Sequence, residues 1–400
     1  MKTVSIITGS ELRQIQGVNY FIKSLIGCNS LFKDVFIKRV YSSKQTLKID
    51  EGDRMPIGND IGTREYAIRT GIRSFLRKLL TDKFYPFALF RYELNYYCNS
   101  HNSAVRYFED NIDSDYIIFQ EIGCAYYYFK LLDNYSYKKM PKTALVIHSE
   151  DDNGSMLLNS FTGFGRRDMQ KRFMKRRDFV YSHIDRVVYI SRKAYNCSVL
   201  PECKKAIVYN GSPDFLYTFK DDAKQCRQFI CVGSFAGRKG QEKIIEAMSL
   251  LDDTHKSKMH LTLVGDGPEQ ENVRNLSAQL HLDKYVTFLG RRNDIPEILK
   301  NKDVFIMPSL VEGLPMSAIE AMRAGLFLIL TDTGGNVELC DDNCGIICTR
   351  DIENIKNTII HVLDKTRIDI VQKQHSRNRF LRDFSLNSMA IGYEHTLLNI

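Results

Sequence analysis

Residues 303–335 read DVFIMPSLVEGLPMSAIEAMRAGLFLILTDTGG, and this stretch decides the fold class. The apolar run 304–309 predicts a strand that ends at its proline, because proline cannot donate a ladder hydrogen bond. A loop follows as far as Pro315, and the next residues predict a helix from near Met316 to just before a glycine. A second apolar strand, 326–332, comes directly after. A strand, a helix and a strand in this order form the repeating unit of a parallel α/β sheet.

The same alternation of apolar runs and amphipathic helical patterns extends over most of the chain. Several runs are apolar on both faces, as strands are when helices cover both sides of a sheet. Helical patterns lie between them, for example at 241–251 and 269–280. The pattern predicts an α/β architecture with doubly wound sheets. The predicted strands are 3–9, 115–120, 143–149, 186–191 and 205–210, then 228–234, 260–266, 285–290, 304–309 and 326–332.

A length of 400 residues suits two domains. The turn formers Asn210-Gly211-Ser212-Pro213 separate the two series of strands and are the best hinge candidate. We therefore predict a domain at 1–211, a second at 212–383, and a terminal helix at 384–400 that belongs to either half. Two Rossmann-like domains that face a cleft would place ligands at the carboxyl ends of their strands.

The first residues, MKTVSIITGS, predict a strand rather than a signal peptide, and no apolar stretch is long enough to span a bilayer. We therefore expect a cytoplasmic protein whose ten cysteines are reduced. Cys340, Cys344 and Cys348 are regularly spaced, but no histidine is near them in the sequence. They are interpreted as small buried apolar side chains rather than as a metal site.

The net charge of +8 is unevenly distributed. Residues 1–210 contain 33 Lys and Arg against 22 Asp and Glu, or +11, whereas the remainder has 23 against 26, or −3. Two segments, 62–92 and 165–178, are especially basic. Each is either a docking surface for anionic lipid head groups or a solvated helix face. The seven basic residues of the second segment are Arg166, Arg167, Lys171, Arg172, Lys175, Arg176 and Arg177.

Two carboxylates within residues 303–335 are candidates for ligand binding. Glu312 belongs to the predicted loop and Glu320 to the predicted helix, and both can accept hydrogen bonds from hydroxyl groups. Backbone N–H groups at the start of that helix have no helical partners, and such a terminus attracts a pyrophosphate. These N–H groups come from Gly313, Leu314, Met316 and Ser317.

With its flanking residues, the stretch resembles the E-x7-E signature of the retaining glycosyltransferases of GT-B architecture, specifically glycosyltransferase family four. The resemblance rests on the pattern P-S-x-x-E-G-x-P-x-x-x-x-E-A-M-x-x-G followed by T-G-G. It implies that Glu312 contacts the transferred sugar and that Glu320 binds the ribose hydroxyls. The donor-binding residues beside them would be Gly313, Leu314, Pro315 and Met316.

Other segments of the second half resemble the family in the required order. Residues 229–248 resemble its donor-phosphate loop, in which Arg238 and Lys239 would neutralise the diphosphate and Gly233 would allow close backbone approach. Ser234 stands where many relatives have an arginine. Residues 263–299 resemble the segment that frames the nucleobase, which implies donor-binding roles for Gly265, Gly267, Gly290 and Arg291, with Phe288 beside the base.

The first half resembles the family less closely. Gly17 matches a glycine of the loop after the first strand, and it would let the backbone approach the donor phosphates and the acceptor. His148 ends the strand 143–149 and matches the family's active-site histidine, which borders the donor sugar. Asp113-Ser114-Asp115 spells the D-x-D metal motif of another glycosyltransferase architecture. It precedes a strand instead of following one, so we interpret it as a turn.

The resemblance implies transfer of a hexose from a UDP- or GDP-linked sugar to an acceptor hydroxyl, with retention at the anomeric carbon. No metal or other cofactor is expected. The implied acceptor is a glycan or a lipid-linked glycan at the inner membrane face, as in polysaccharide or lipopolysaccharide synthesis. The alternatives are a sugar-nucleotide epimerase of the same architecture and a non-catalytic protein that binds glycans or nucleic acid. Nothing in the sequence resembles a nucleic-acid-binding motif.

Overall fold

The computed structural model divides the chain into two compact units, which are described separately. Unit 1 consists of Met1–Val208 and Ala390–Ile400, and unit 2 consists of Tyr209–Met389. The structure describes residues 1–11, 17–50, 89, 93–94, 97–110, 113–135, 139–154, 163–215, 217, 219, 227–364 and 368–400. The basic segment 62–92 lies outside the described residues, apart from one helical residue at position 89.

Unit 1 is built on a seven-stranded sheet in the order β3-β2-β1-β4-β5-β6-β7. All neighbouring strands are parallel except β2 and β3. The strands are β1 (Lys2–Ile7), β2 (Val35–Tyr41), β3 (Thr46–Lys48), β4 (Tyr116–Phe119), β5 (Lys142–Ile147), β6 (Arg186–Tyr189) and β7 (Lys205–Ile207). β4 is buried along its whole length, as is expected of a central strand covered on both faces.

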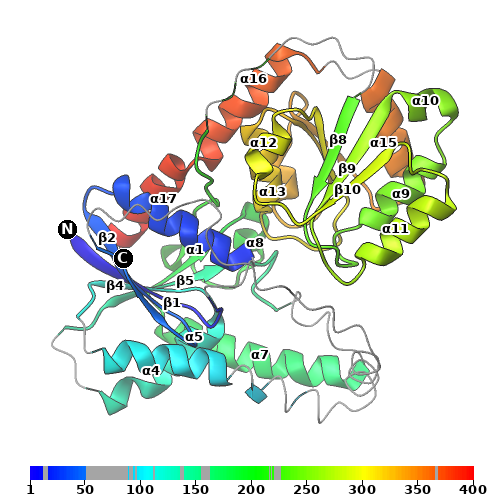
Figure 1. Cartoon of the computed structure of the whole chain (residues 1–400). Coiled ribbons are helices and arrows are strands. Elements are labelled where there is room, and N and C mark those ends of the chain that lie inside the picture. Colours follow the sequence, from blue (N-terminus) through cyan, green and yellow to red (C-terminus); the bar gives the residue numbers. More distant parts are fainter. Residues whose placement is uncertain are drawn as a thin grey trace. The chain divides into compact units, whose positions relative to one another are not determined.

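Helices cover both faces of this sheet. Figure 1 shows α4, α5 and α7 on one face, with α1 and α17 on the other. On the second face the ring of Phe21 lies 6.1 Å from that of Tyr393, which brings the last helix against the first. The helices are α1 (Gly17–Gly27), α4 (Asn102–Glu109), α5 (Ile122–Leu131), α7 (Gly163–His183), α8 (Arg192–Cys197) and α17 (Leu386–Leu398).

Unit 2 has a six-stranded sheet in the order β10-β9-β8-β11-β12-β13, and every neighbouring pair is parallel. The strands are β8 (Arg227–Val232), β9 (Met259–Val264), β10 (Val286–Gly290), β11 (Val304–Met307), β12 (Phe327–Thr331) and β13 (Gly345–Cys348). Both β11 and β12 are completely buried. Residues 303–335 therefore form the centre of this unit.

Two groups of helices flank the second sheet. Figure 1 shows α9, α11 and α15 on one side, and α12 and α13 on the other. Together with shorter connections, they complete a second doubly wound layer structure. The helices are α9 (Gln241–Ser249), α10 (Asp253–Ser257), α11 (Gln270–Gln279), α12 (Ile295–Leu299), α13 (Met316–Arg323), α14 (Asn336–Leu339), α15 (Ile352–Asp364) and α16 (Ile370–Arg379).

Both sheets have the strand order of a Rossmann-type fold, in which the order reverses beside the first strand. The reversal falls between β1 and β4 in unit 1 and between β8 and β11 in unit 2. The predicted α/β fold with two Rossmann-like domains is confirmed. The sequence analysis did not identify β2 and β3: β2 (VFIKRVY) carries two cations among its apolar residues, and β3 has only three residues.

The structure divides the chain at Val208, slightly before the hinge segment that the sequence suggested, and it assigns the last eleven residues to unit 1. Glu394 accepts hydrogen bonds from the backbone N–H groups of Lys33 and Asp34, at 2.7 and 2.6 Å. Arg186 donates to the carbonyl of Asn399 at 2.7 Å. None of the helices formed by the described residues is long and apolar enough to cross a membrane.

Candidate functional site

An ion pair bridges the two strands at the reversal point of unit 2. Lys239 comes from the loop after β8 and Glu312 from the loop after β11. The Lys239 Nζ lies 2.6 Å from Glu312 Oε1, and the side chains are only 12% and 7% exposed. Arg238 is more exposed, and its guanidinium lies 4.0 Å from the same oxygen. The carboxyl end of parallel strands at such a point is the usual ligand position in an open α/β sheet.

The loop that carries the two cations is held against the loop after β11 by backbone contacts. The N–H of Leu310 donates to the carbonyl of Arg238 at 2.7 Å. Arg350, which follows β13, donates to the carbonyls of Pro308 and Gly237 at 3.0 and 3.1 Å. Gly240 has a φ of 76°, and a Cβ there would lie 2.3 Å from the Pro308 carbonyl. Only glycine fits so close to that strand end.

The T-G-G sequence after β12 supports the loop that contains Glu312. Gly334 has a φ of 52°, and an added Cβ would lie 2.0 Å from the Glu312 carbonyl. The N–H of Gly335 donates to the carbonyl of Gly313 at 2.6 Å. The hydroxyl of Thr333 donates to the Leu310 carbonyl at 3.1 Å. These three residues therefore fix the path of the loop and, with it, the carboxylate of Glu312.

Helix α13 begins at Met316. Pro315 directly before it is the N-cap residue, with a φ of −71° and an extended backbone conformation. Within the described part of the chain, the N–H groups of Gly313, Leu314, Met316 and Ser317 donate to no backbone carbonyl. They are the donors that a helix start offers to an anion. Glu320 lies on the second turn of the helix and is half-buried. Asn210 donates to the Leu314 carbonyl at 2.9 Å and holds this segment in unit 2.

Three glycines bring the loops after β8, β9 and β10 together. Gly265 has a φ of 141°, and a Cβ there would lie 2.0 Å from the Gly233 carbonyl. Its N–H donates to the carbonyl of Gly290 at 2.8 Å. At Gly267, with a φ of 152°, a Cβ would lie 2.4 Å from the Phe235 carbonyl. The fold therefore requires glycine at positions 265 and 267, whatever the ligand.

The predicted nucleobase position is only partly open. The ring of Phe288 lies 6.3 Å from the ring of Phe235. The guanidinium of Arg274 lies 4.6 Å from the centroid of the Phe288 ring. One face of Phe288 is therefore covered by the chain itself. Arg291 is exposed just after β10, so it is free to contact a planar ligand.

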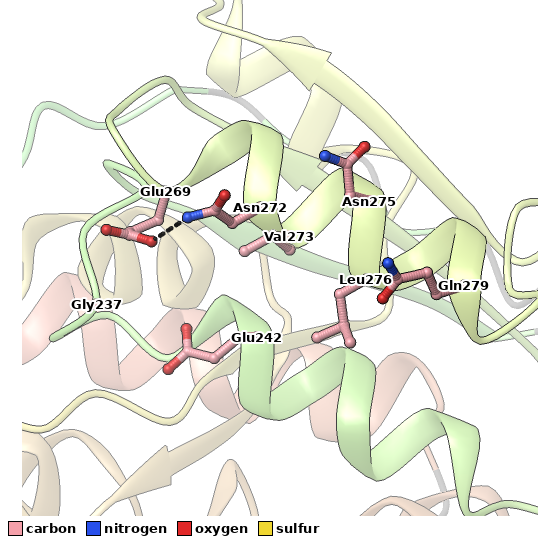
Figure 2. A pocket seen from close by; sticks show the side chains of 8 residues that line it. All are labelled: Gly237, Glu242, Glu269, Asn272, Val273, Asn275, Leu276 and Gln279. Atoms are coloured by element: carbon pink, nitrogen blue, oxygen red, sulfur yellow. Dashed lines mark hydrogen bonds between the residues drawn. The ribbon is translucent and has the colours of Figure 1, made fainter. Parts of the chain in front are cut away.

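A groove of about 720 Å³ lies between α9 and α11 and reaches Gly237 of the cationic loop. Figure 2 shows the carboxylates of Glu242 and Glu269 beside this groove. The side-chain amide of Asn272 donates a hydrogen bond to the carboxylate of Glu269. Two carboxylates, and the absence of a cation among the described residues that line the groove, disfavour a diphosphate, which needs positive charge nearby. The groove is therefore distinct in chemistry from the Lys239 side of the same loop.

In unit 1, His148 directly follows β5, at the carboxyl end of that strand. Its Nε2 lies 2.9 Å from Gln120 Oε1, and its ring meets the edge of Phe21 at a centroid distance of 4.6 Å. Burial lowers the pKa of His148 to about 4, so its imidazole is neutral at pH 7. A neutral ring that donates from Nε2 to the amide oxygen keeps Nδ1 as a hydrogen-bond acceptor.

Gly17 and the acidic triplet at 113–115 occupy different ends of unit 1. Gly17 is the first residue of α1, is exposed, and a Cβ there would meet nothing within 4 Å. Asp115 precedes β4, accepts from the Thr3 N–H at 2.9 Å and pairs with Lys139 at 2.8 Å. Among the described residues no group of three or more His, Cys, Asp or Glu side chains is arranged to hold a metal ion.

One residue of the basic segment 165–178, which lies within α7, does not face solvent as the sequence suggested. Arg177 is buried and donates to Asn153 Oδ1 at 2.7 Å, so it holds the loop after β5 instead of facing solvent. Arg176 pairs with Glu93. Of the seven basic residues, those classed as exposed are Arg166, Arg167, Lys171, Arg172 and Lys175.

The three regularly spaced cysteines are free thiols, and Cys344 and Cys348 are buried. Burial raises the pKa of each of these two thiols to about 11, so both are protonated at pH 7. Cys340 is half-buried, and burial also raises its pKa. This agrees with the interpretation of the three residues as small apolar side chains.

Sequence reasoning missed three polar residues that organise these loops: Gln120, Glu121 and Arg350. Each lies just after the carboxyl end of a strand, β4 for the first two and β13 for the third. That position was the available signal, because functional side chains gather at this end of an α/β sheet. The contacts that distinguish them are made to side-chain and backbone atoms far along the chain, and no local pattern reveals such contacts.

Known proteins resemble this chain in both sequence and structure. Residues 219–379 match the family model of the glycosyl transferases group 1. A UDP-Gal:alpha-D-GlcNAc-diphosphoundecaprenol alpha-1,3-galactosyltransferase of Escherichia coli is 35% identical over 31% of this chain and 33% of its own length. The O-antigen biosynthesis glycosyltransferase WclY of Escherichia coli is 29% identical over 55% of this chain and 63% of its own. The chain thus spans less than two thirds of the length of these relatives.

Solved structures with the same fold cover the chain more completely. HepE of Anabaena, solved in complex with UDP, matches 100% of both chains with a TM-score of 0.67 and 14% identity. Sucrose-phosphate synthase of Thermosynechococcus elongatus matches 99% of this chain and 98% of its own, with a TM-score of 0.67 and 16% identity. The whole chain therefore has the GT-B fold, and residues 219–379 are similar to the glycosyl transferases of group 1.

Proposed function

We propose that the protein transfers a sugar from a nucleoside-diphosphate donor to an acceptor hydroxyl during the synthesis of a surface polysaccharide. The observation that carries this proposal is the Lys239–Glu312 pair at the reversal point of unit 2. It combines a largely buried cation for a phosphate with a carboxylate for sugar hydroxyls in one place. In this proposal unit 2 binds the donor and unit 1 binds the acceptor.

The ion pair can bind a donor without being broken. A lysine ammonium has three N–H donors, so Lys239 can keep Glu312 and still donate to a diphosphate oxygen. The contacts of Glu312 with both cations are made through Oε1, so Oε2 is available to accept a bond from a sugar hydroxyl. Glu320, on the second turn of α13, would accept from the ribose hydroxyls. The roles of Glu320 and of the neighbouring glycines are those that the resemblance to glycosyltransferase family four implies.

The reaction is proposed to retain the anomeric configuration. The bond between the anomeric carbon and the diphosphate oxygen breaks, and its electron pair stays with the leaving diphosphate. The acceptor oxygen bonds to the same face of that carbon, and its proton passes to a phosphate oxygen. Lys239, Arg238 and the start of α13 stabilise the growing charge, which makes a metal ion unnecessary. Turnover should then be unaffected by EDTA.

The relatives suggest substrate classes for both halves. The galactosyltransferase of Escherichia coli is named for a UDP-linked donor and a diphosphoundecaprenol acceptor, and HepE was solved with UDP. We infer that this chain uses a UDP-linked hexose and a lipid-linked glycan. The exposed cations of α7, such as Lys171 and Lys175, would favour contact with an anionic inner membrane face.

A panel of nucleoside diphosphates and their sugars, read out by thermal unfolding, tests the donor half. A ligand at 100 times its dissociation constant adds about 2.7 kcal/mol to the free energy of unfolding. We expect UDP and one UDP-hexose to raise the melting temperature, with no requirement for Mg²⁺. If no nucleoside diphosphate stabilises the protein, the proposal fails in favour of a non-catalytic binding protein.

The reaction itself is tested by incubating the stabilising sugar nucleotide with and without a lipid-linked glycan. Transfer predicts release of UDP that depends on the acceptor and a new glycosidic bond, whose anomeric configuration NMR compares with that of the donor. An altered sugar nucleotide formed from donor alone would instead identify an epimerase. An inverted product would contradict the proposed retention while leaving the transfer itself intact.

A further inference from the structure

Two consecutive polar residues, Gln120 and Glu121, follow β4 at the reversal point of unit 1. Glu121 accepts hydrogen bonds from three successive residues that follow β1. Its Oε1 receives the hydroxyls of Thr8 at 3.0 Å and Ser10 at 3.1 Å, and its Oε2 receives the N–H of Gly9 at 2.9 Å. One carboxylate thus holds three successive residues that lie more than 100 positions earlier in the chain.

Gln120 reaches in the other direction, toward β5. It is 2% exposed, and its Oε1 lies 2.9 Å from Nε2 of His148. Its backbone N–H donates to the carbonyl of Ile7 at 3.1 Å, which anchors the residue on β1. The two residues after β4 therefore set the position of the loop at 8–10 on one side and of the His148 ring on the other.

The same kind of bond occurs at the opposite end of the sheet. Asp185, just before β6, accepts the N–H and the hydroxyl of Thr143, both at 2.8 Å. Asp115, just before β4, accepts the N–H and hydroxyl of Thr3 at 2.9 and 3.3 Å. A carboxylate that binds a threonine on the next strand is therefore a repeated device for holding strand ends together. Glu121 differs from the other two because it lies at the carboxyl ends of the strands, where ligands bind.

The geometry argues against Glu121 as a general base. Both carboxylate oxygens are occupied by donors from its own unit, and Cys124 Sγ lies 3.6 Å from Oε2 as a further weak donor. A base needs a free oxygen within hydrogen-bond reach of the proton that it removes. The loop is also packed from its other side, since Ser103 donates to the Thr8 carbonyl at 2.7 Å.

We propose that Glu121 and Gln120 are positioning residues for the acceptor half of the reaction. Glu121 fixes the loop at 8–10 beside the acceptor, and Gln120 fixes the ring of His148, which the family resemblance places at the border of the donor sugar, so that the side of unit 1 that faces the acceptor keeps one geometry. The inference rests on the proposed transferase function, because it assigns the acceptor to unit 1. A misplacement of about 1 Å in such a site can lower the rate about 100-fold.

Two substitutions at Glu121 separate positioning from charge. Glu121→Leu removes every acceptor and should lower kcat by about 100-fold. Glu121→Gln should restore kcat to within about tenfold of wild type, because its amide oxygen can accept from Gly9 and its NH₂ can donate to the two hydroxyls. The affinity for UDP, measured by thermal shift, should be the same in both variants.

The matched control is Asp185→Leu, which removes the equivalent bonds at the amino end of the sheet. It should lower the melting temperature as Glu121→Leu does but leave kcat near the wild-type value. If Glu121→Leu does not fold, Thr8→Val replaces it. That variant removes one donor from the same loop, and kcat should fall about tenfold.

The proposal is overturned if Glu121→Leu, or Thr8→Val in its place, keeps the wild-type kcat. It is also overturned if Glu121→Gln is as slow as Glu121→Leu, since the carboxylate charge itself would then matter. Failure of the transferase function looks different, because wild-type protein would then consume no donor. In that case amide hydrogen exchange at Gly9 decides: faster exchange in Glu121→Leu but not in Glu121→Gln supports the positioning role, and equal exchange in all three proteins refutes it.

Discussion

The reversal points of the two units have the same topology but different chemistry. In unit 2 the strands β8 and β11 are bridged by a cation and a carboxylate, Lys239 and Glu312, at 2.6 Å. In unit 1 the strands β1 and β4 are bridged by a carboxylate and neutral donors, with Glu121 accepting from Thr8, Gly9 and Ser10. One point can neutralise an anion and the other cannot.

Under the proposed function, the difference accounts for two ligands on one fold. The strand order fixes where a ligand binds. At each reversal point the connections after two neighbouring strands run in opposite directions, which leaves a crevice beside the carboxyl ends of these strands. The side chains that follow the strands then decide what binds. A largely buried lysine favours a diphosphate, whereas hydroxyls and a neutral histidine favour an uncharged sugar. Substitutions that act on one unit only can therefore break the comparison.

The largest effect is expected at the ion pair of unit 2. Lys239→Ala removes a cation from the leaving diphosphate and should lower kcat by about 100-fold, which corresponds to about 3 kcal/mol of transition-state stabilisation. Steady-state kinetics with a UDP-hexose and a lipid-linked glycan measures it. Lys243→Ala removes a lysine that pairs with Glu246 at 2.9 Å on α9 and serves as the matched control. Equal rates for the two variants would refute the assignment of Lys239.

Glycine substitutions test whether loop glycines serve the fold or the ligand. At Gly265, with a φ of 141°, a Cβ would lie 2.0 Å from the Gly233 carbonyl. Gly265→Ala should therefore lower the free energy of unfolding by about 2 to 3 kcal/mol. Urea unfolding measures this loss. Gly237→Ala, where a Cβ would meet nothing within 4 Å, should stay within about 0.5 kcal/mol of wild type. A Gly265 variant of wild-type stability would contradict the geometry.

The neutral His148 of unit 1 predicts a pH dependence of stability. Burial lowers its pKa to about 4 from an ordinary value near 6.5, so between these values the unfolded chain binds a proton that the folded chain does not. Stability is therefore lost as the pH falls through this window, by about 2 kcal/mol at pH 5. His148→Asn, which keeps a side-chain partner for Gln120, should lose that much less between pH 7.5 and pH 5. Equal losses in the two proteins would place the pKa near its ordinary value.

The two units also differ in how much of them could be predicted from sequence. In unit 2 the residues around Glu312 are contiguous, so the strand, the loop and the start of α13 at Met316 were visible in one stretch. In unit 1 the contacts of Glu121 and Gln120 join residues more than 25 positions apart, and the three donors to Glu121 come from one short loop. Buried Arg177 was misjudged as a surface residue for the same reason. Its partner Asn153 lies on another element, and charge patterning along α7 cannot show that contact.

Gly17 is where the smallest effect on stability is expected and where the comparison is sharpest. Unlike Gly265, it has open space around it, and it is the first residue of α1. Gly17→Ala should therefore raise the free energy of unfolding slightly, by up to about 1 kcal/mol, because alanine favours helix over glycine. Its activity should nevertheless fall if close approach of a ligand to the backbone is the reason for glycine here. Urea unfolding and kcat measured on the same protein separate the two effects. A stabilised variant with wild-type kcat would show that Gly17 serves neither the fold nor the ligand, and the loop at 8–10 and His148 would then be the parts of unit 1 that are proposed to face a ligand.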